Sequence, residues 1–442
     1  MRFVENGCLH INRNKKKTIH LALRLPEIVS HIMYFLTAPY QYDENNKAKT
    51  FQYIYPCLFV NVIWHDCALR LIWRHITFED SKSEYDAFLK FAHTIANRHP
   101  QTSYSQTDLN SSAAGLAIAV PKASNSLAGP DKRFLFSKHQ DNETKNRIAI
   151  NMTNTLEDHP TYATQTQVQR AARLYTSKQH QASNYSNFSA NHHHYRCRSA
   201  VRTISLRKIK EKNINEPLQL IGSRAKYLEK LDIYICDHLS DSSIYAFISH
   251  HNCFLSYLSL AGCNRITDDA ILNVARHCPR LEHLDLRACG LISDTSIQAI
   301  ANCCPRLHHL NVGRVRDREK ITMQSINLIA QKTQVAVLGL AGCDMTDECL
   351  ILLAKCRGEK LERISVNNCY RITNKTIQAY VKYCPNLSVF EMKECHWIDD
   401  WASVAELVQR KVLLTLCDQQ NKACAEWARR RGKVMEVKAP VK

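Results

Sequence analysis

The chain has 442 residues, a formal net charge of +18 and nineteen cysteines. Its length allows two or three domains or one elongated array of repeats. Its first thirty residues contain no continuous apolar run, and no later segment is apolar for long enough to cross a membrane, so we expect neither an export signal nor membrane insertion. We predict a soluble protein of the cytoplasm, the nucleus or both, whose cysteines are reduced thiols.

The positive charge raises the question of nucleic acid. Some of it lies in residues 1–20, a basic N-terminal tail with the run Lys15–Lys17, and in the run Arg429–Arg431. Such runs are typical of solvated tails, with nuclear targeting as the alternative. Because no recognition motif accompanies the charge, we do not expect nucleic-acid binding.

Residues 21–95 are predicted to form a small helical domain. Pro26 suits the first position of a helix, and Ile28, Ile32 and Leu36 follow at intervals of four residues, so they share one face. A second apolar stretch covers residues 57–78 and contains Trp64, which so small a unit can hide only in part. The remaining apolar face predicts a surface for a partner, with a plain helical cap as the alternative.

Residues 96–199 are rich in Ser, Thr, Asn, Gln and His. Such a stretch buries too little apolar surface to offset the entropy lost on ordering, so we predict a largely flexible linker. The run His192–His194 lies there without a second group of ligands, and we predict no metal site.

Residues 200–398 repeat a Leu-x-x-Leu-x-Leu-x-x-Cys pattern about eight times, at spacings of 26–28 residues that are typical of leucine-rich repeats. The Leu-x-Leu part alternates like a strand with one buried face, and Thr or Ser beside Asp or Asn then caps a helix. We predict an α/β solenoid with a parallel sheet on its concave face and helices on its convex face. The units begin at Val201, Leu228, Leu255, Leu281, Leu307, Val335, Leu361 and Leu387.

The cysteines recur at two places in each unit. Cys263 marks the end of a strand and Cys278 the end of a helix, and most other units have equivalents. Ile209 and Val315 take the first place in two units, and no Cys-x-x-Cys occurs, so we predict packing rather than a metal site or a disulfide. Redox sensitivity stays the alternative for the adjacent Cys303 and Cys304.

Signs of catalysis are missing from the sequence. It contains neither a Gly-x-Ser-x-Gly motif nor a phosphate-binding Gly-x-x-x-x-Gly-Lys-Ser/Thr loop, and it has only eleven glycines. We therefore predict no catalytic residue and no cofactor.

Residues 399–431 are predicted to be a helical C-terminal cap. They have acids at the start, apolar residues at helical spacing and cations at the end, as a cap over the last repeat should. Residues 432–442 are then a tail.

Two stretches carry a family resemblance. LRLPEIVSHIMYFL at residues 23–36 and CLFVNVIWHDCALRLIWRHITF at residues 57–78 resemble the two halves of an F-box, and the eighteen residues 37–54 lie between them. The stretches CNRITD, CGLISD and CYRITN resemble the cysteine-containing repeats of F-box/leucine-rich-repeat proteins and of the related antagonists of mitotic exit. The order, F-box first and repeats after, is that of the family.

This resemblance implies a non-catalytic substrate receptor of an SCF-type ubiquitin ligase. Its F-box would dock a Skp-type adaptor, and through it a cullin–RING ligase, while the repeats hold an unknown protein target for ubiquitination and proteasomal degradation. A binding or inhibitory scaffold in cell-cycle signalling is the alternative. The residues expected to contact the adaptor are Leu25, Pro26, Ile28, Ile32, Leu36, Leu58, Val60 and Trp64.

For the target we expect side chains next to the inward leucines, because these point to the concave surface. They are Arg207, Asp232, Tyr234, Tyr257, His283, Asp285, Arg287, His309, Asn311, Arg363, Asn367, Glu391 and Lys393.

Overall fold

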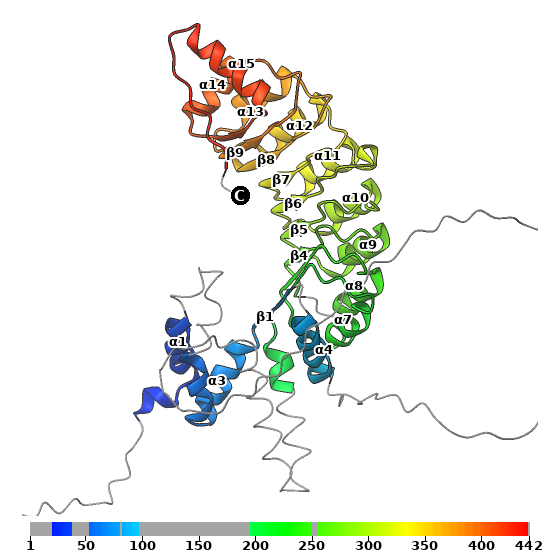
Figure 1. Cartoon of the computed structure of the whole chain (residues 1–442), viewed down its shortest axis with the longest axis vertical. Helices are drawn as coiled ribbons and strands as arrows, with labels where there is room; N and C mark the ends of the chain where they lie inside the picture. The colour runs from blue at the N-terminus through cyan, green and yellow to red at the C-terminus, as the bar shows by residue number, and fades with distance from the viewer. Residues whose placement is uncertain (1–19, 38–52, 80–81, 97–194, 250–253, 441–442) are drawn as a thin grey trace, which may run out of the picture. The chain divides into compact units, whose positions relative to one another are not determined.

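The computed structural model describes residues 20–37, 53–79, 82–96, 195–249 and 254–440 (Figure 1). Most of the predicted linker, Lys15–Lys17, His192–His194 and Cys253 lie outside the described residues. Within the described part, no helix combines the length and the apolar character that a membrane span requires.

One parallel sheet runs through the repeats. Its strands follow each other in chain order and pair in parallel, so equivalent residues of successive units lie side by side. This arrangement confirms the predicted solenoid. The strands in the described residues are β1 (His75–Phe78), β2 (Thr203–Arg207), β3 (Lys230–Tyr234), β4 (Tyr257–Ser259), β5 (His283–Asp285), β6 (His309–Asn311), β7 (Val337–Gly339), β8 (Arg363–Ser365), β9 (Val389–Glu391) and β10 (Leu413–Thr415).

The helices of the repeats lie along one side of this sheet (Figure 1). They pack in succession and share one continuous core with the strands, in which Leu284 and Leu286 are buried. The helices of the array are α4 (Lys82–Ala96), α7 (Asn215–Gly222), α8 (Asp241–Ile248), α9 (Asp268–His277), α10 (Asp294–Cys303), α11 (Met323–Lys332), α12 (Asp347–Arg357), α13 (Asn374–Tyr383), α14 (Trp401–Gln409) and α15 (Asp418–Arg429), with short 3-10 turns η6 (Arg318–Lys320) and η7 (Gly358–Lys360).

Aspartates at the helix starts join neighbouring units. Thr267 caps α9 by accepting a hydrogen bond from the Asp269 backbone N–H at 3.2 Å, as expected from the sequence. Asp268 instead accepts bonds from the next cap, Ser293, at 2.8 Å from its N–H and 2.5 Å from its hydroxyl. We call this arrangement the Asp ladder. It also joins Asp241 to Thr267, Asp294 to Thr322 and Asp347 to Thr373.

Both ends of the array extend beyond the predicted repeats. β1 and α4 lie within the predicted helical domain, yet β1 pairs with β2, and Phe78 and Phe88 belong to the core of the repeats. The predicted helical cap at 399–431 is wrong in one respect, because it contains β10 between its two helices. The stretch after α15 then returns to the sheet, where the Leu414 N–H donates to the Lys438 carbonyl at 2.8 Å.

One repeat departs from the regular pattern, in the loop 313–322. Val315 was expected in the buried cysteine position, but its side chain is 85% exposed, so that prediction is wrong. This unit is longer, and the guanidinium of Arg314 is buried instead, donating to the carbonyls of Asp317 at 3.0 Å and Ile292 at 3.1 Å. Gly342 (φ +72°) lies beneath this loop, where a Cβ would be 2.0 Å from the Arg314 carbonyl oxygen.

The helical unit before β1 has a core of its own. It contains η1 (Leu21–Arg24), α1 (Pro26–Thr37), η4 (Tyr55–Phe59) and α3 (Val62–Ile72). Val29 and Met33 of α1 are fully buried against this small core, whereas the predicted stripe of Ile28, Ile32 and Leu36 faces away from it. The unit therefore buries a narrow stripe of α1 and leaves a broader apolar stripe uncovered.

Candidate binding surfaces

The helical unit presents an exposed apolar surface. Leu25 is 46% exposed, Ile28 42%, Leu36 37% and Val60 57%, and Pro26 is exposed as well. Ile28, Ile32 and Leu36 follow each other at intervals of four residues on α1 and so share one face, and apolar side chains grouped on an uncovered face mark an interaction surface. Further exposed members that the sequence does not single out are Phe35, Phe59 and Val62.

Three of the residues predicted for the adaptor are only partly accessible. Ile32, Leu58 and Trp64 are half-buried, and Leu58 and Trp64 pack against the core of the helical unit. The Asn61 side chain caps α3 by accepting a bond from the Trp64 N–H at 3.0 Å. Trp64 thus has a structural role in addition to any contact with a partner.

The second candidate surface is the side of the sheet that faces away from the helices, which we call the strand face. Parallel register turns its side chains into rows that cross the strands. The ring row consists of Lys230, Tyr257, His283, His309, Val337 and Arg363. The acid row consists of Asp232, Ser259, Asp285, Asn311, Gly339, Ser365 and Glu391.

The rings of the ring row stack on each other. The centroids of Tyr257 and His283 are 3.9 Å apart with the planes 9° from parallel, and His283 and His309 are also 3.9 Å apart. The Lys230 ammonium lies 3.9 Å from the centroid of the Tyr257 ring, a cation–π contact. The three rings and the lysine form a continuous, half-buried strip.

Burial sets the protonation of this strip. Burial first, and then the Coulombic effects of His309, Lys230 and Arg287, together lower the pKa of the His283 imidazole to about 3. Burial also lowers the pKa of His309 and raises the pKa of Tyr257 to about 12. Both imidazoles and the phenol are therefore neutral at pH 7.

The carboxylates of the acid row are paired with arginines. Asp285 is buried, against the expectation that it is open to a target, because Arg287 folds over it with contacts of 2.7–3.0 Å. Arg207 lies 3.8 Å from Asp232. The remaining pair joins Arg363 to Glu391.

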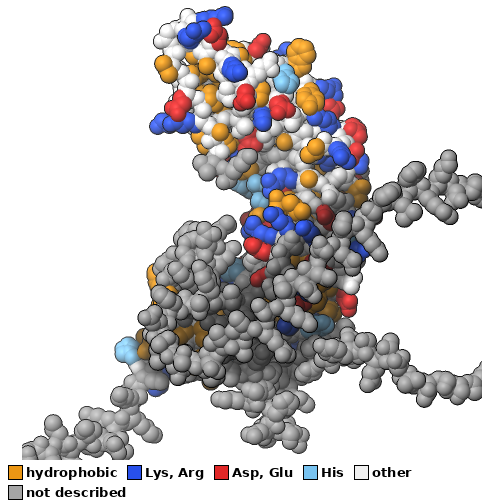
Figure 2. Space-filling view, viewed as in Figure 1, with side chains coloured by type: hydrophobic (Ala, Val, Ile, Leu, Met, Phe, Trp, Pro, Cys, Tyr) orange, Lys and Arg blue, Asp and Glu red, His pale blue; other side chains and the backbone are white. Residues whose placement is uncertain are grey.

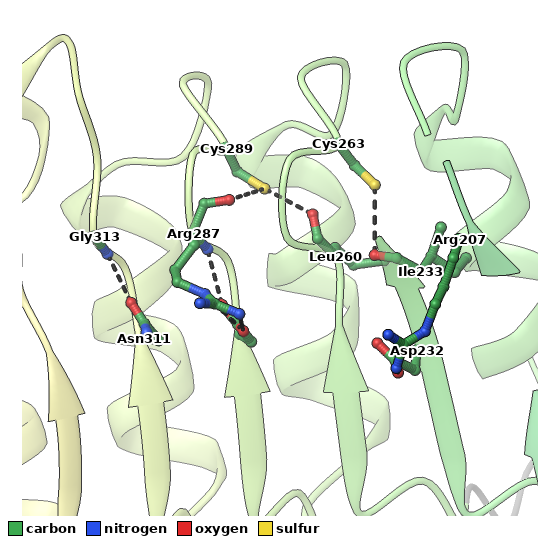
Figure 3. A network of polar contacts seen from close by, with 10 residues as sticks. Arg207, Asp232, Ile233, Leu260, Cys263, Arg287, Cys289, Asn311 and Gly313 are labelled. Carbon is green, nitrogen blue, oxygen red and sulfur yellow. Dashed lines mark hydrogen bonds and ion pairs between the residues drawn. The ribbon is translucent and has the colours of Figure 1, made fainter. Parts of the chain in front are cut away.

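Small side chains complete the acid row at its middle. Asn311 accepts a bond from the Gly313 N–H at 3.1 Å (Figure 3). Its side chain extends over Gly339, where a Cβ would be only 2.4 Å from the amide oxygen. Further along, Asn367 binds Glu391 at 3.2 Å and accepts from the Lys393 N–H at 2.7 Å. Most of the predicted target residues are thus held in place by their neighbours.

The cysteines at the strand ends bond to the preceding repeat. The Cys289 thiol donates to the Leu260 carbonyl at 3.1 Å, and Cys263 reaches the Ile233 carbonyl at 3.7 Å (Figure 3). Burial raises the pKa of Cys289 to about 12, so this thiol is protonated and inert. The same bond is made by Cys343, Cys369 and Cys395.

The cysteines at the helix ends are less uniform. Cys304 is buried and bonds to the Cys278 carbonyl at 3.4 Å, while the adjacent Cys303 is exposed. Cys356 is exposed too, and Arg357 takes the buried place, donating to the carbonyls of Val335 at 2.9 Å and Thr333 at 2.8 Å. Over the part of the chain that the structure describes, no three His, Cys, Asp or Glu side chains group as metal ligands would.

The ring row contains two residues that were not predicted from the sequence, Lys230 and Val337. Both directly precede the first buried residue of a strand, as do Tyr257, His283 and His309 in their units. The alignment of the repeats alone could have identified them.

Comparison with known proteins supports the repeat architecture. Residues 251–275 and 277–301 match a family model described as a leucine-rich repeat. The antagonist of mitotic exit network protein 1 of Yarrowia lipolytica is 46% identical over 150 residues, which are 34% of this chain and 21% of that protein. Its namesake from Eremothecium gossypii is 32% identical over 237 residues, which are 50% of this chain and 59% of that protein.

A further namesake, from Candida glabrata, is 33% identical over 202 residues, covering 45% of this chain and 34% of that protein. The matches thus span less than two thirds of the length of each of these relatives. Among solved structures, a crystal structure of the yeast Rad7 and Elc1 complex is similar at a TM-score of 0.39 and 15% identity, over 53% of this chain and 65% of that chain.

Proposed function

Since the chain is a leucine-rich-repeat protein related to the antagonists of the mitotic exit network, we propose that it is the target-recognition subunit of an SCF-type ubiquitin ligase. The helical unit docks a Skp-type adaptor and, through it, a cullin–RING ligase. The strand face holds a protein target for ubiquitination and proteasomal degradation. Both surfaces act by binding alone, because a target held beside the transfer centre meets it at a high effective concentration.

One observation carries this proposal, the apolar surface of the helical unit. Leu25 and Ile28 are more than two fifths exposed on a unit whose own core already contains Val29 and Met33. Leaving such side chains in water costs free energy that a partner would recover. The resemblance of this stretch to an F-box supports a Skp-type adaptor as that partner.

Co-purification tests the proposal. The full chain is tagged, and the adaptor and cullin are measured in the recovered material for the wild type and for a Leu25→Asp/Ile28→Asp double variant. The control is Leu291→Asp, because Leu291 is 47% exposed but lies in a repeat loop. We expect the wild type and the control to recover both partners and the double variant to lose them. A wild type that recovers neither contradicts the ligase proposal.

The second candidate is a scaffold without ligase function that inhibits a cell-cycle signalling protein. The name of the relatives, antagonist of mitotic exit network protein, favours it. In that case the wild type lacks adaptor and cullin in the same experiment, yet the strand face still binds its target.

We propose the cytoplasm, the nucleus or both as the location, and Arg429–Arg431, exposed at the end of α15, as a candidate nuclear-targeting run.

A further inference from the structure

The charges of the strand face do not balance. Each carboxylate of the acid row has an arginine within 4 Å, so Asp232, Asp285 and Glu391 are already neutralised by their own neighbours. Lys230 differs from the arginines of this face. Within the described residues, the structure records a cation–π contact with Tyr257 for Lys230 and no ion pair. The face therefore carries an unneutralised cation at the start of the ring row.

The ring row next to this cation is apolar and flat. Tyr257, His283 and His309 stack at 3.9 Å and are half-buried, and the row continues to Val337. Rings fixed in this way lose little conformational entropy when something packs on them, which makes them good anchors for a partner's aromatic or long apolar side chain. Figure 2 shows Lys and Arg side chains gathered with histidine and hydrophobic side chains near the middle of the array.

From these two features we infer that the strand face takes an acidic linear peptide segment, with a carboxylate bound by Lys230 and a neighbouring aromatic or long apolar side chain lying along Tyr257, His283 and His309. This inference rests on the proposed role of the strand face in holding a target, and it names the chemical class of that target. Lys230 supplies a charge-assisted hydrogen bond, and the ring row supplies the apolar contact.

The acid row argues against single-stranded nucleic acid, the other ligand for which cations and rings are suited. Its carboxylates run beside the ring row over the same strands, from Asp232 of β3 to Glu391 of β9. A nucleic acid carries a charge at every phosphate and needs cations along its length, but these carboxylates already occupy Arg207, Arg287 and Arg363. A peptide can place its acid opposite Lys230 alone.

Selection from a random dodecapeptide library displayed on phage tests the inference with the purified full chain. We expect the selected peptides to carry Asp or Glu within a few residues of an aromatic or long apolar residue. A selection without this bias, or one dominated by basic peptides, overturns the inference. Displacement of the selected peptides by a thymidine oligonucleotide at low concentration overturns it in favour of nucleic acid.

Variants then locate the peptide site. The best peptide is synthesised, and its affinity is measured by fluorescence anisotropy. Lys230→Ala should weaken binding about tenfold, the loss of one charge-assisted bond, and His283→Ser should weaken it as well. The matched control is Lys382→Ala, because Lys382 also lies over a tyrosine ring, 5.2 Å from Tyr383, but on helix α13. Equal affinities for Lys230→Ala and Lys382→Ala overturn the placement.

A loss of folding is separated from a loss of binding in two ways. Thermal melting of each variant is measured first, and Lys230→Glu, which leaves the three stacked rings of Tyr257, His283 and His309 in place, should abolish binding of the acidic peptide while keeping the melting temperature. The purified chain is used without adaptor or cullin. Peptide selection can therefore succeed where adaptor recovery fails, and either proposal can be lost without the other.

Discussion

The helical unit and the repeats treat their apolar residues in opposite ways. In the repeats, each strand and helix has neighbours on both sides, and residues such as Leu284 and Ile297 are fully covered. The helical unit has a buried core of only six described residues, while Leu25, Ile28 and Phe35 remain exposed. A repeat array completes its own core through stacking, whereas the small helical unit leaves apolar surface open, and this is the surface that we propose a partner covers.

The largest effect expected from this contrast compares one leucine in each region. Leu284→Ala removes a side chain with 0% exposure and should reduce the free energy of unfolding by about 2–5 kcal/mol. Leu25→Ala, at a position 46% exposed, should change it by no more than about 0.5 kcal/mol. Chemical denaturation followed by circular dichroism measures both. Similar losses in the two variants would show that the helical unit is as tightly packed as the repeats.

The Asp ladder offers a sharper version of the same test. Asp268→Ala removes two hydrogen bonds to Ser293 of the next unit and should cost about 1–3 kcal/mol of stability, because the donors lose a charged acceptor. Asp269→Ala is the control, since Asp269 is exposed in the same first turn of α9 and loses the same interaction with the helix dipole. If both variants lose equal stability, the ladder does not couple the units.

The buried imidazoles predict a dependence on pH. The pKa of His283 is lowered to about 3 in the folded chain, so between this value and about 6.5 the unfolded chain binds more protons. Keeping His283 neutral therefore stabilises the folded chain. The contribution is complete above about pH 6.5 and is lost as the pH falls toward 3. Its slope stays below about 1.4 kcal/mol per pH unit for one group. Unfolding measured from pH 7 to pH 4 should show it.

His283→Phe is the variant for that experiment, because phenylalanine keeps a ring in the stack and cannot titrate. We expect a shallower loss of stability with falling pH than in the wild type. An unchanged slope would mean that other groups, such as His75 with its lowered pKa, account for the dependence.

The smallest expected effect concerns a buried hydroxyl in the core of the repeats, that of Tyr380, for which the structure records no hydrogen-bond partner among the described residues. Tyr380 occupies the position of Ile300 and Leu353 in other units, stacks on Phe390 and is fully buried, and its hydroxyl has no hydrogen-bond partner. Tyr380→Phe should leave stability unchanged or raise it by about 1 kcal/mol. Tyr383→Phe, on the same helix, is the control for the loss of a hydroxyl. A clear loss of stability in Tyr380→Phe alone would mean that this hydroxyl is bonded.

How much the sequence predicts depends on whether a signal recurs. Leu284, Cys289 and Ser293 each have equivalents one repeat away, so the strand, the buried thiol and the helix cap are all predictable from their periodicity. The bond between Asp268 and Ser293 is not, because the sequence marks both residues as parts of a helix start but not as partners across units.

Where a signal occurs once, the sequence predicts less. β1 joins β2 across more than a hundred residues, and no periodicity announces that pairing. Val315 lies in the longest unit. There the loop is shifted, so Arg314 is buried where Val315 was expected and Val315 is exposed. On the strand face, alternation identifies the outward residues, but the stacking of His283 on Tyr257 and the closure of Arg287 over Asp285 depend on the register between strands.

The return of the chain after α15 has a consequence for how the array ends. In a sheet made of repeated strands, the last strand has unpaired backbone N–H and C=O groups along its outer edge. Another molecule can add a strand there. Residues 433–440 cover the last strand, β10. The Leu414 N–H donates its hydrogen bond to the Lys438 carbonyl, and the partly buried Met435 and Val437 pack against the core. A truncation before residue 433 would expose the outer edge of β10. We then expect oligomers that form edge to edge and increase with protein concentration.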